Sequence, residues 1–118
     1  MGWEVYPQSI YHLLKKFDGY EGIKKIIITE NGAAFPDIVK NGKVHDIKRT
    51  HFIQDNLEQI LKAKKDGVNV DGYFVWSLTD NFEWAEGYNA RFGLIHVDFE
   101  TQNRTIKNSG LWFKDFLS

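Results

Sequence analysis

The chain has 118 residues with 15 basic and 16 acidic side chains, so its formal net charge is −1. Hydrophobic residues make up 42% of it and aromatic residues 15%, which is typical of a globular domain rather than a disordered segment. The absence of cysteine excludes disulfides, thiolate metal ligands and a cysteine nucleophile. Near-neutral charge argues against a nucleic-acid partner, and no apolar run approaches the roughly 20 residues that a membrane span needs. No signal peptide is visible, so we expect a cytoplasmic protein.

The first predicted helix follows Pro7, a residue that suits the first turn of a helix, and should end near residues 18–19. Its apolar residues recur at helical spacing and form one face: Ile10, Leu13, Leu14 and Phe17. Residues 25–29 contain three consecutive isoleucines without alternation. We therefore expect a strand that is buried on both faces, as in a parallel sheet covered by helices.

Residues 33–49 are predicted to form a loop, in which Asn41-Gly42 suits the type I′ turn of a small hairpin. Thr50 is a candidate N-cap for a helix that runs to about Asp66 and is closed by Gly67. The core face of this helix is predicted to consist of Ile53, Leu57, Ile60 and Leu61.

A second buried strand is predicted over residues 72–78, followed by a polar, aromatic loop. Apolar residues at 95, 97 and 99 alternate with polar ones, which predicts a half-exposed hairpin strand turning near residues 102–103. Asn108 or Ser109 can cap a last helix. Strands separated by helices of this length are typical of parallel βα units, so the predicted fold class is α/β. Because two such strands cannot complete a sheet, residues 1–118 are predicted to form a single, incomplete domain.

Acidic residues follow both predicted strands, where functional residues of parallel βα folds gather. Glu30 comes directly after the isoleucines, and Asp80 and Glu83 follow the second strand, with Trp76 and Trp84 on either side of them. Such a group suits a sugar site, because indole faces stack on pyranose rings and carboxylates accept hydrogen bonds from hydroxyls. The alternative is that Trp76 belongs to the core and the acids are solvated loop residues. The spacing alone favours neither interpretation.

The remaining polar residues predict no second site. Asp37 and Asp46 are expected to serve turns. Four residues lack the spacing of zinc ligands and are expected in loops or on the surface: His12, His45, His51 and His96. The sequence therefore predicts no metal site.

Several segments together resemble glycoside hydrolase family 1, the β-glucosidase family of retaining (β/α)8-barrel enzymes. Residues 28–32, I-T-E-N-G, resemble the family segment of the same letters. Residues 76–88, W-S-L-T-D-N-F-E-W-A-E-G-Y, resemble the family's eighth strand and the loop after it. Residues 2–7 and 91–99 extend the likeness over most of the chain. The resemblance implies a partial TIM barrel made of its last two βα units, from the sixth helix to the eighth.

The resemblance implies a role for each of five residues. Glu30 matches the catalytic nucleophile, and Glu83 matches the residue that binds the O4 and O6 hydroxyls of the sugar in the −1 subsite. Trp84 matches a donor to O3, Trp76 the indole platform beneath the sugar, and Phe92 an aromatic wall of the pocket. Family members that act on 6-phosphorylated sugars lack the acid at Glu83, so its presence implies an unphosphorylated substrate.

The implied reaction is hydrolysis of terminal β-D-glucosyl residues with retention, without a cofactor or metal. It needs a second carboxyl, the acid/base, about 5–5.5 Å from the nucleophile. In the family this acid lies in an Asn-Glu-Pro segment, which is absent from the sequence. We therefore expect the chain to be inactive by itself and to need an N-terminal barrel portion. Two alternatives stay open: a non-enzymatic sugar-binding fragment, and an assembly module that pairs its strand edges with an N-terminal portion or with a second copy.

Overall fold

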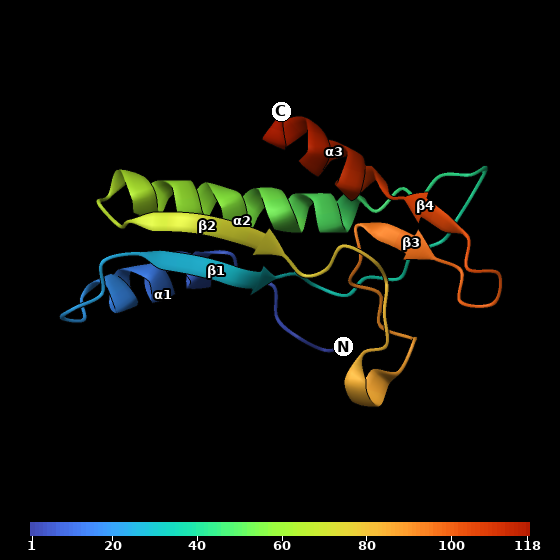
Figure 1. Cartoon of the computed structure of the whole chain (residues 1–118), viewed down its shortest axis with the longest axis horizontal. Helices are drawn as coiled ribbons and strands as arrows, with labels where there is room; N and C mark the ends of the chain where they lie inside the picture. The colour runs from blue at the N-terminus through green and yellow to red at the C-terminus, as the bar shows by residue number, and fades with distance from the viewer.

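In the computed structural model, which describes residues 1–118, helices cover one face of a two-stranded parallel sheet and a short hairpin lies beside its end (Figure 1). The elements in chain order are α1 (Gln8–Asp18), β1 (Ile26–Asn31), α2 (Ile47–Lys65), β2 (Val70–Val75), the short 3₁₀ helix η1 (Trp84–Glu86), β3 (Ile95–Val97), β4 (Arg104–Ile106) and α3 (Asn108–Leu117). None of the helices combines the length and apolar character that crossing a membrane requires.

The parallel pairing of β1 and β2 confirms the predicted βα arrangement. Ile26 lies opposite Val70 and Ile28 opposite Tyr73. β2 ends at Val75 rather than at residue 78, because the segment 77–80 pairs with residues 92–95 instead of with β1. The carboxyl ends of both strands nevertheless lie at the same edge of the sheet.

The expectation that both faces of these strands are buried is wrong. Ile26 and Ile28 pack on the helices, whereas Ile27 between them is 46% exposed. On β2, Phe74 is 60% exposed while its neighbours Tyr73 and Val75 pack against the core. The strands alternate because the three helices all lie on one side of the sheet.

The helices α1 and α2 follow the predicted periodicity only in part. On α1 only Leu14 of the predicted face is buried, since Leu13 and Phe17 lie beside the stripe that contacts α2. On α2 the prediction that Leu61 lies in the core is wrong, because Leu61 is 54% exposed. Side chains from α1, α2 and the segments around the sheet form the core: Leu14, Ile53, Leu57, Ile60, Ala63, Val68, Val70 and Leu94.

The predicted N-caps of α2 and α3 are both wrong, although the two predicted hairpin turns are confirmed. α2 begins at Ile47, so Thr50 lies inside its first turn, and the hydroxyl of Ser109 at the start of α3 bonds elsewhere. Asn41 and Gly42 have φ angles of 51° and 70°, as the predicted type I′ turn requires. The antiparallel pairing of β3 with β4 confirms the second hairpin.

Candidate functional site

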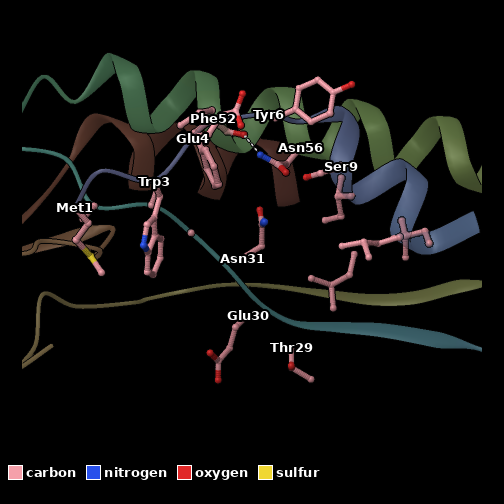
Figure 2. Close-up of a pocket in the computed structure, with 18 of the residues that line it drawn as sticks. Met1, Trp3, Glu4, Tyr6, Ser9, Thr29, Glu30, Asn31, Phe52 and Asn56 are labelled. Atoms are coloured by element: carbon pink, nitrogen blue, oxygen red, sulfur yellow. Dashed lines mark hydrogen bonds between the residues drawn. The ribbon is translucent and has the colours of Figure 1, made fainter. Parts of the chain in front are cut away.

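Glu30 lies at the carboxyl end of β1, on an exposed part of the strand. Figure 2 shows its carboxylate on the opposite side of the strand from Asn31 and Trp3, as the pleat of a strand requires. Asn31 is engaged, because its Oδ1 accepts a 2.8 Å hydrogen bond from the hydroxyl of Tyr73. Glu30 makes no side-chain hydrogen bond or ion pair within the chain, so its carboxylate is free to meet another molecule.

Trp76 lies beside Glu30, because the chain after β2 approaches the chain after β1 very closely. The amide of Trp76 donates to the Asn31 carbonyl at 2.9 Å. A Cβ atom on Gly32 would lie 1.7 Å from the Trp76 carbonyl oxygen, so only glycine fits there. The Trp76–Ser77 peptide bond is cis, and the indole of Trp76 is partly exposed.

Glu83 and Trp84 lie on the loop that projects from the carboxyl end of the sheet (Figure 1). The Glu83 amide donates to the Gly87 carbonyl at 2.7 Å, and the Gly87 amide donates to the Trp84 carbonyl at 3.2 Å. These bonds form a tight turn in which Trp84 is 87% exposed. The loop therefore holds Glu83 half-buried and presents the Trp84 indole to the surroundings.

Phe92 is buried, unlike the other four candidate residues. It is 4% exposed, and its ring centroid is 6.4 Å from that of Trp3. Its carbonyl accepts from the Ser77 amide at 3.2 Å, so it supports the segment after Trp76 from behind.

A cavity of about 660 Å³ lies between α1 and β1 and is bordered by Glu30. Hydrophobic residues make up 15 of its 22 lining residues. The amide of Asn56 inside it already donates to the Phe52 carbonyl, as the dashed line in Figure 2 shows. Since a sugar needs many hydrogen-bonding partners, the exposed carboxyl edge suits a sugar better than this cavity.

Asp80, the third acid that follows the strands, is not available to a ligand. Its carboxylate is buried and accepts from Lys107 Nζ at 2.7 Å, from Arg91 at 2.5 Å and from the Gly93 amide at 3.0 Å. Burial opposes ionisation of Asp80, but the two cations outweigh it and hold the pKa of Asp80 below its usual range. Asp80 therefore serves the structure beneath the loop.

Asp80 belongs to a buried ion network that sequence reasoning missed. Arg49 makes two hydrogen bonds to the Asp37 carboxylate, at 3.0 and 2.8 Å, and one to Asp46. Lys107 bridges Asp37, at 2.6 Å, to Asp80. The network contains three acids and three bases, so its formal charges cancel: Asp37, Asp46, Asp80, Arg49, Arg91 and Lys107.

The network also corrects two expectations. Asp37 and Asp46 do not serve only turns, because Asp46 accepts from the amide and hydroxyl of Ser109 and so fastens α3 to the start of α2. Burial alone would lower the pKa of Arg49, but the two carboxylates raise it above its usual value. His96 is buried beside the network rather than on the surface.

The structure shows no group of three or more His, Asp or Glu side chains arranged to hold a metal ion.

Comparison with known proteins identifies the family. The profile described as glycosyl hydrolase family 1 matches residues 1–118. The chain belongs to this family. Among its curated relatives, the 1,4-beta-D-glucan glucohydrolase of Thermotoga neapolitana is 51% identical over 118 residues, covering 99% of this chain and 27% of the relative. Beta-glucosidase A of Acetivibrio thermocellus is 52% identical, with coverages of 99% and 26%.

A solved structure agrees with the sequence comparison. The family 1 β-glucosidase of Thermotoga maritima matches with a TM-score of 0.97 and 49% identity, over 99% of this chain and 27% of that chain. The predicted family is confirmed, and the fold corresponds to part of a family 1 TIM barrel. The chain spans about a quarter of the length of the relatives it matches.

One further relative bears on the substrate. The 6-phospho-beta-galactosidase of Clostridium acetobutylicum is 50% identical over 113 residues, covering 95% of this chain and 24% of the relative. The chain is thus almost as similar to this 6-phospho-beta-galactosidase as to the glucohydrolase of Thermotoga neapolitana, to which it is 51% identical. Only individual residues can therefore distinguish the two substrate classes.

Proposed function

We propose that this chain supplies the nucleophile and part of the −1 sugar site of a retaining β-glucosidase, as the last two βα units of the barrel. The observation that carries the proposal is the free, exposed carboxylate of Glu30 at the carboxyl edge of the sheet, beside Trp76. Active sites of TIM-barrel enzymes lie at this edge. Membership of the family adds support, since its relatives include β-glucosidases.

In the proposed reaction Glu30 attacks the anomeric carbon while the bond to the leaving oxygen breaks, which forms a covalent glycosyl-enzyme. An acid/base carboxyl protonates that oxygen and then removes a proton from the water that releases the sugar. Glu83 is needed for binding and Asp80 is held in ion pairs. We therefore propose that the acid/base comes from an N-terminal barrel portion and that the chain alone is inactive.

The sugar would lie between the partly exposed Trp76 and the loop that carries Glu83 and Trp84. Trp76 offers an indole face to the apolar side of the ring, and Glu83 accepts hydrogen bonds from the outer hydroxyls. A carboxylate at this position would repel a 6-phosphate, whose charge is of the same sign. We therefore propose terminal β-D-glucosyl residues without phosphate as the substrate class.

Hydrolysis of a chromogenic β-glucoside tests this function. The chain should give no turnover alone, since general acid–base catalysis is typically worth about 10²- to 10⁴-fold. Turnover should appear when an N-terminal family 1 portion is added, should disappear in Glu30→Gln, and should be far weaker with the 6-phosphoglucoside. Turnover by the chain alone that Glu30→Gln abolishes would contradict the proposed division of roles.

Self-association is the second candidate function, and the open face of the sheet favours it. Ile27, Phe74 and Leu78 expose 46%, 60% and 66% of their surface on or next to the strands. Exposed apolar surface of this kind marks an interface, and open strand edges invite pairing. A chain that forms defined oligomers but gives no hydrolysis with any N-terminal portion would favour an assembly module, whereas sugar binding without hydrolysis would favour a binding fragment.

A further inference from the structure

We propose that Arg91 is a positioning residue: it fixes the loop of residues 81–90 and thereby sets how well Glu83 holds the outer hydroxyls of the sugar. The role of Glu83 in this inference rests on the proposed function. The geometry of the loop is independent of it.

Arg91 closes the neck of the loop. Its guanidinium donates to Asp80, at 2.5 Å, across the whole loop, and to the Val97 carbonyl at 2.9 Å. The Asp80 side chain is fully buried and is fixed from below by Lys107. Both ends of the loop are thus joined at a point that the buried network holds in place.

The hydrogen bonds of the loop do not attach its tip to the rest of the protein. The amides of residues 83, 86, 87 and 89 all donate to carbonyls between residues 83 and 87. These bonds give the turn its shape, but they leave its orientation to other contacts.

A series of side-chain contacts supplies that orientation, and it begins at Arg91. The Arg91 guanidinium carbon lies 4.8 Å from the centroid of the Phe99 ring. The Phe99 ring lies 4.3 Å from Tyr88, and Tyr88 lies 5.4 Å from Phe82. Since Phe82 directly precedes Glu83, this series of tilted and edge-on ring contacts runs from Arg91 to the residue next to the proposed sugar-binding carboxylate.

A lysine could not replace Arg91 fully. A guanidinium is planar, so it can donate to Asp80 and Val97 at its edge while its face covers Phe99. An ammonium group could keep the ion pair but could not also bond to Val97 and cover the Phe99 ring. Arg91→Lys should therefore restore only part of what Arg91→Met loses.

Amide hydrogen exchange on the full chain tests the positioning role directly. In Arg91→Met the amides of Glu83, Glu86, Gly87 and Asn89 should exchange about tenfold faster or more, while amides inside α2 keep their rates. Arg104→Met is the matched control, because Arg104 is exposed on β4 and its side chain donates only to the Gln102 carbonyl. Unchanged exchange in the loop, or an equal increase in α2, would overturn the proposal.

Sugar discrimination gives a readout that a merely structural role would not move. In the chain combined with an N-terminal family 1 portion, kcat/KM is compared for a β-glucoside and for a β-xyloside, which lacks the hydroxymethyl group. Arg91→Met should reduce the glucoside preference about tenfold, mainly through KM, and should reduce it no further in a Glu83→Gln background. Equal losses on both substrates would overturn the sugar role of Arg91.

The two measurements separate failure of this inference from failure of the proposed function. If Glu83→Gln leaves the glucoside preference intact, the assignment of Glu83 is wrong and the sugar role of Arg91 is overturned with it. Hydrogen exchange in the loop would still decide whether Arg91 orients residues 81–90.

Discussion

The two faces of the parallel sheet differ sharply, although both are built from apolar residues. On one face Ile26, Ile28 and Tyr73 pack against the helix-covered core. On the other, Ile27 and Phe74 are 46% and 60% exposed. Burying a large apolar side chain contributes about 1.5–3 kcal/mol, so the open face leaves a substantial stabilisation unrealised.

The two faces of the sheet therefore depend on different sources of packing surface. The covered face is completed by helices of the same chain, namely α1, α2 and α3. Nothing in the described arrangement covers the open face. The helix-covered face of the sheet is thus packed by the chain's own helices. The open face would need apolar surface from another molecule to be covered.

The largest loss in the free energy of unfolding should come from breaking the buried ion network around Lys107. Lys107→Met should reduce the free energy of unfolding by about 3–5 kcal/mol, because it leaves Asp37 and Asp80 buried with one cation fewer. Urea unfolding at a fixed protein concentration measures this. Lys25→Met is the matched control: the Lys25–Asp71 pair is exposed, so its loss should cost about 1 kcal/mol or less. Equal effects of the two substitutions would contradict the account.

Neighbouring isoleucines on β1 compare the two faces directly. Ile28→Ala should cost about 2 kcal/mol, since Ile28 packs against the core, and Ile27→Ala about half that or less. The same strand and the same substitution keep the change in backbone propensity matched. Urea midpoints that fall equally in both variants would show that the open face is covered in solution.

We expect the open face to drive self-association when no N-terminal portion is present. Phe74→Lys should weaken the association about tenfold or more, because it places a charge on the apolar patch. Sedimentation at micromolar concentrations measures this, with Phe17→Lys on α1 as a control that should leave the association unchanged. A compact wild-type monomer that binds no apolar dye would refute the expectation.

The smallest effect should be the change in the pH dependence of stability that comes from His96. Burial and then the charge of Arg91 lower the pKa of His96, so the unfolded chain takes up a proton at a higher pH than the folded chain. The stability that neutral His96 contributes is full above its unfolded pKa, about 6.5, and is lost as pH falls towards the folded value. Replacing His96 by glutamine should flatten this decline by about 1 kcal/mol or less. Urea midpoints at pH 8 and pH 5.5 measure it, with His12→Gln on α1 as the control.

The sequence predicted the local elements better than their surroundings. The strand of isoleucines, the Asn41-Gly42 turn and the helix after Pro7 are all in place, because each depends on its own residues and immediate neighbours. Burial on both faces of β1 was wrong, since that property depends on what lies against the strand.

The candidate site also contains features that depend on neighbouring residues and features that depend on distant ones. The strand pattern predicted acids and indoles at the carboxyl edge, and the structure has Glu30 and Trp76 there, whereas Asp80 of the same group is buried in ion pairs. The network could not be predicted, because Lys107 lies 70 residues from Asp37 and 27 from Asp80. Only Asp46 and Arg49 have a spacing that suggests an ion pair, three residues apart at the start of α2.

We propose Glu30 as the nucleophile, and covalent labelling tests this role most directly. The chain is combined with an N-terminal family 1 portion and incubated with a 2-deoxy-2-fluoro β-glucoside, whose fluorine slows breakdown of the glycosyl-enzyme so that it accumulates. Peptide mapping should place the adduct on Glu30, within the peptide that contains residues 28–32. Glu30→Gln should abolish the labelling. An adduct on Glu83 or Asp80 would contradict the assignment.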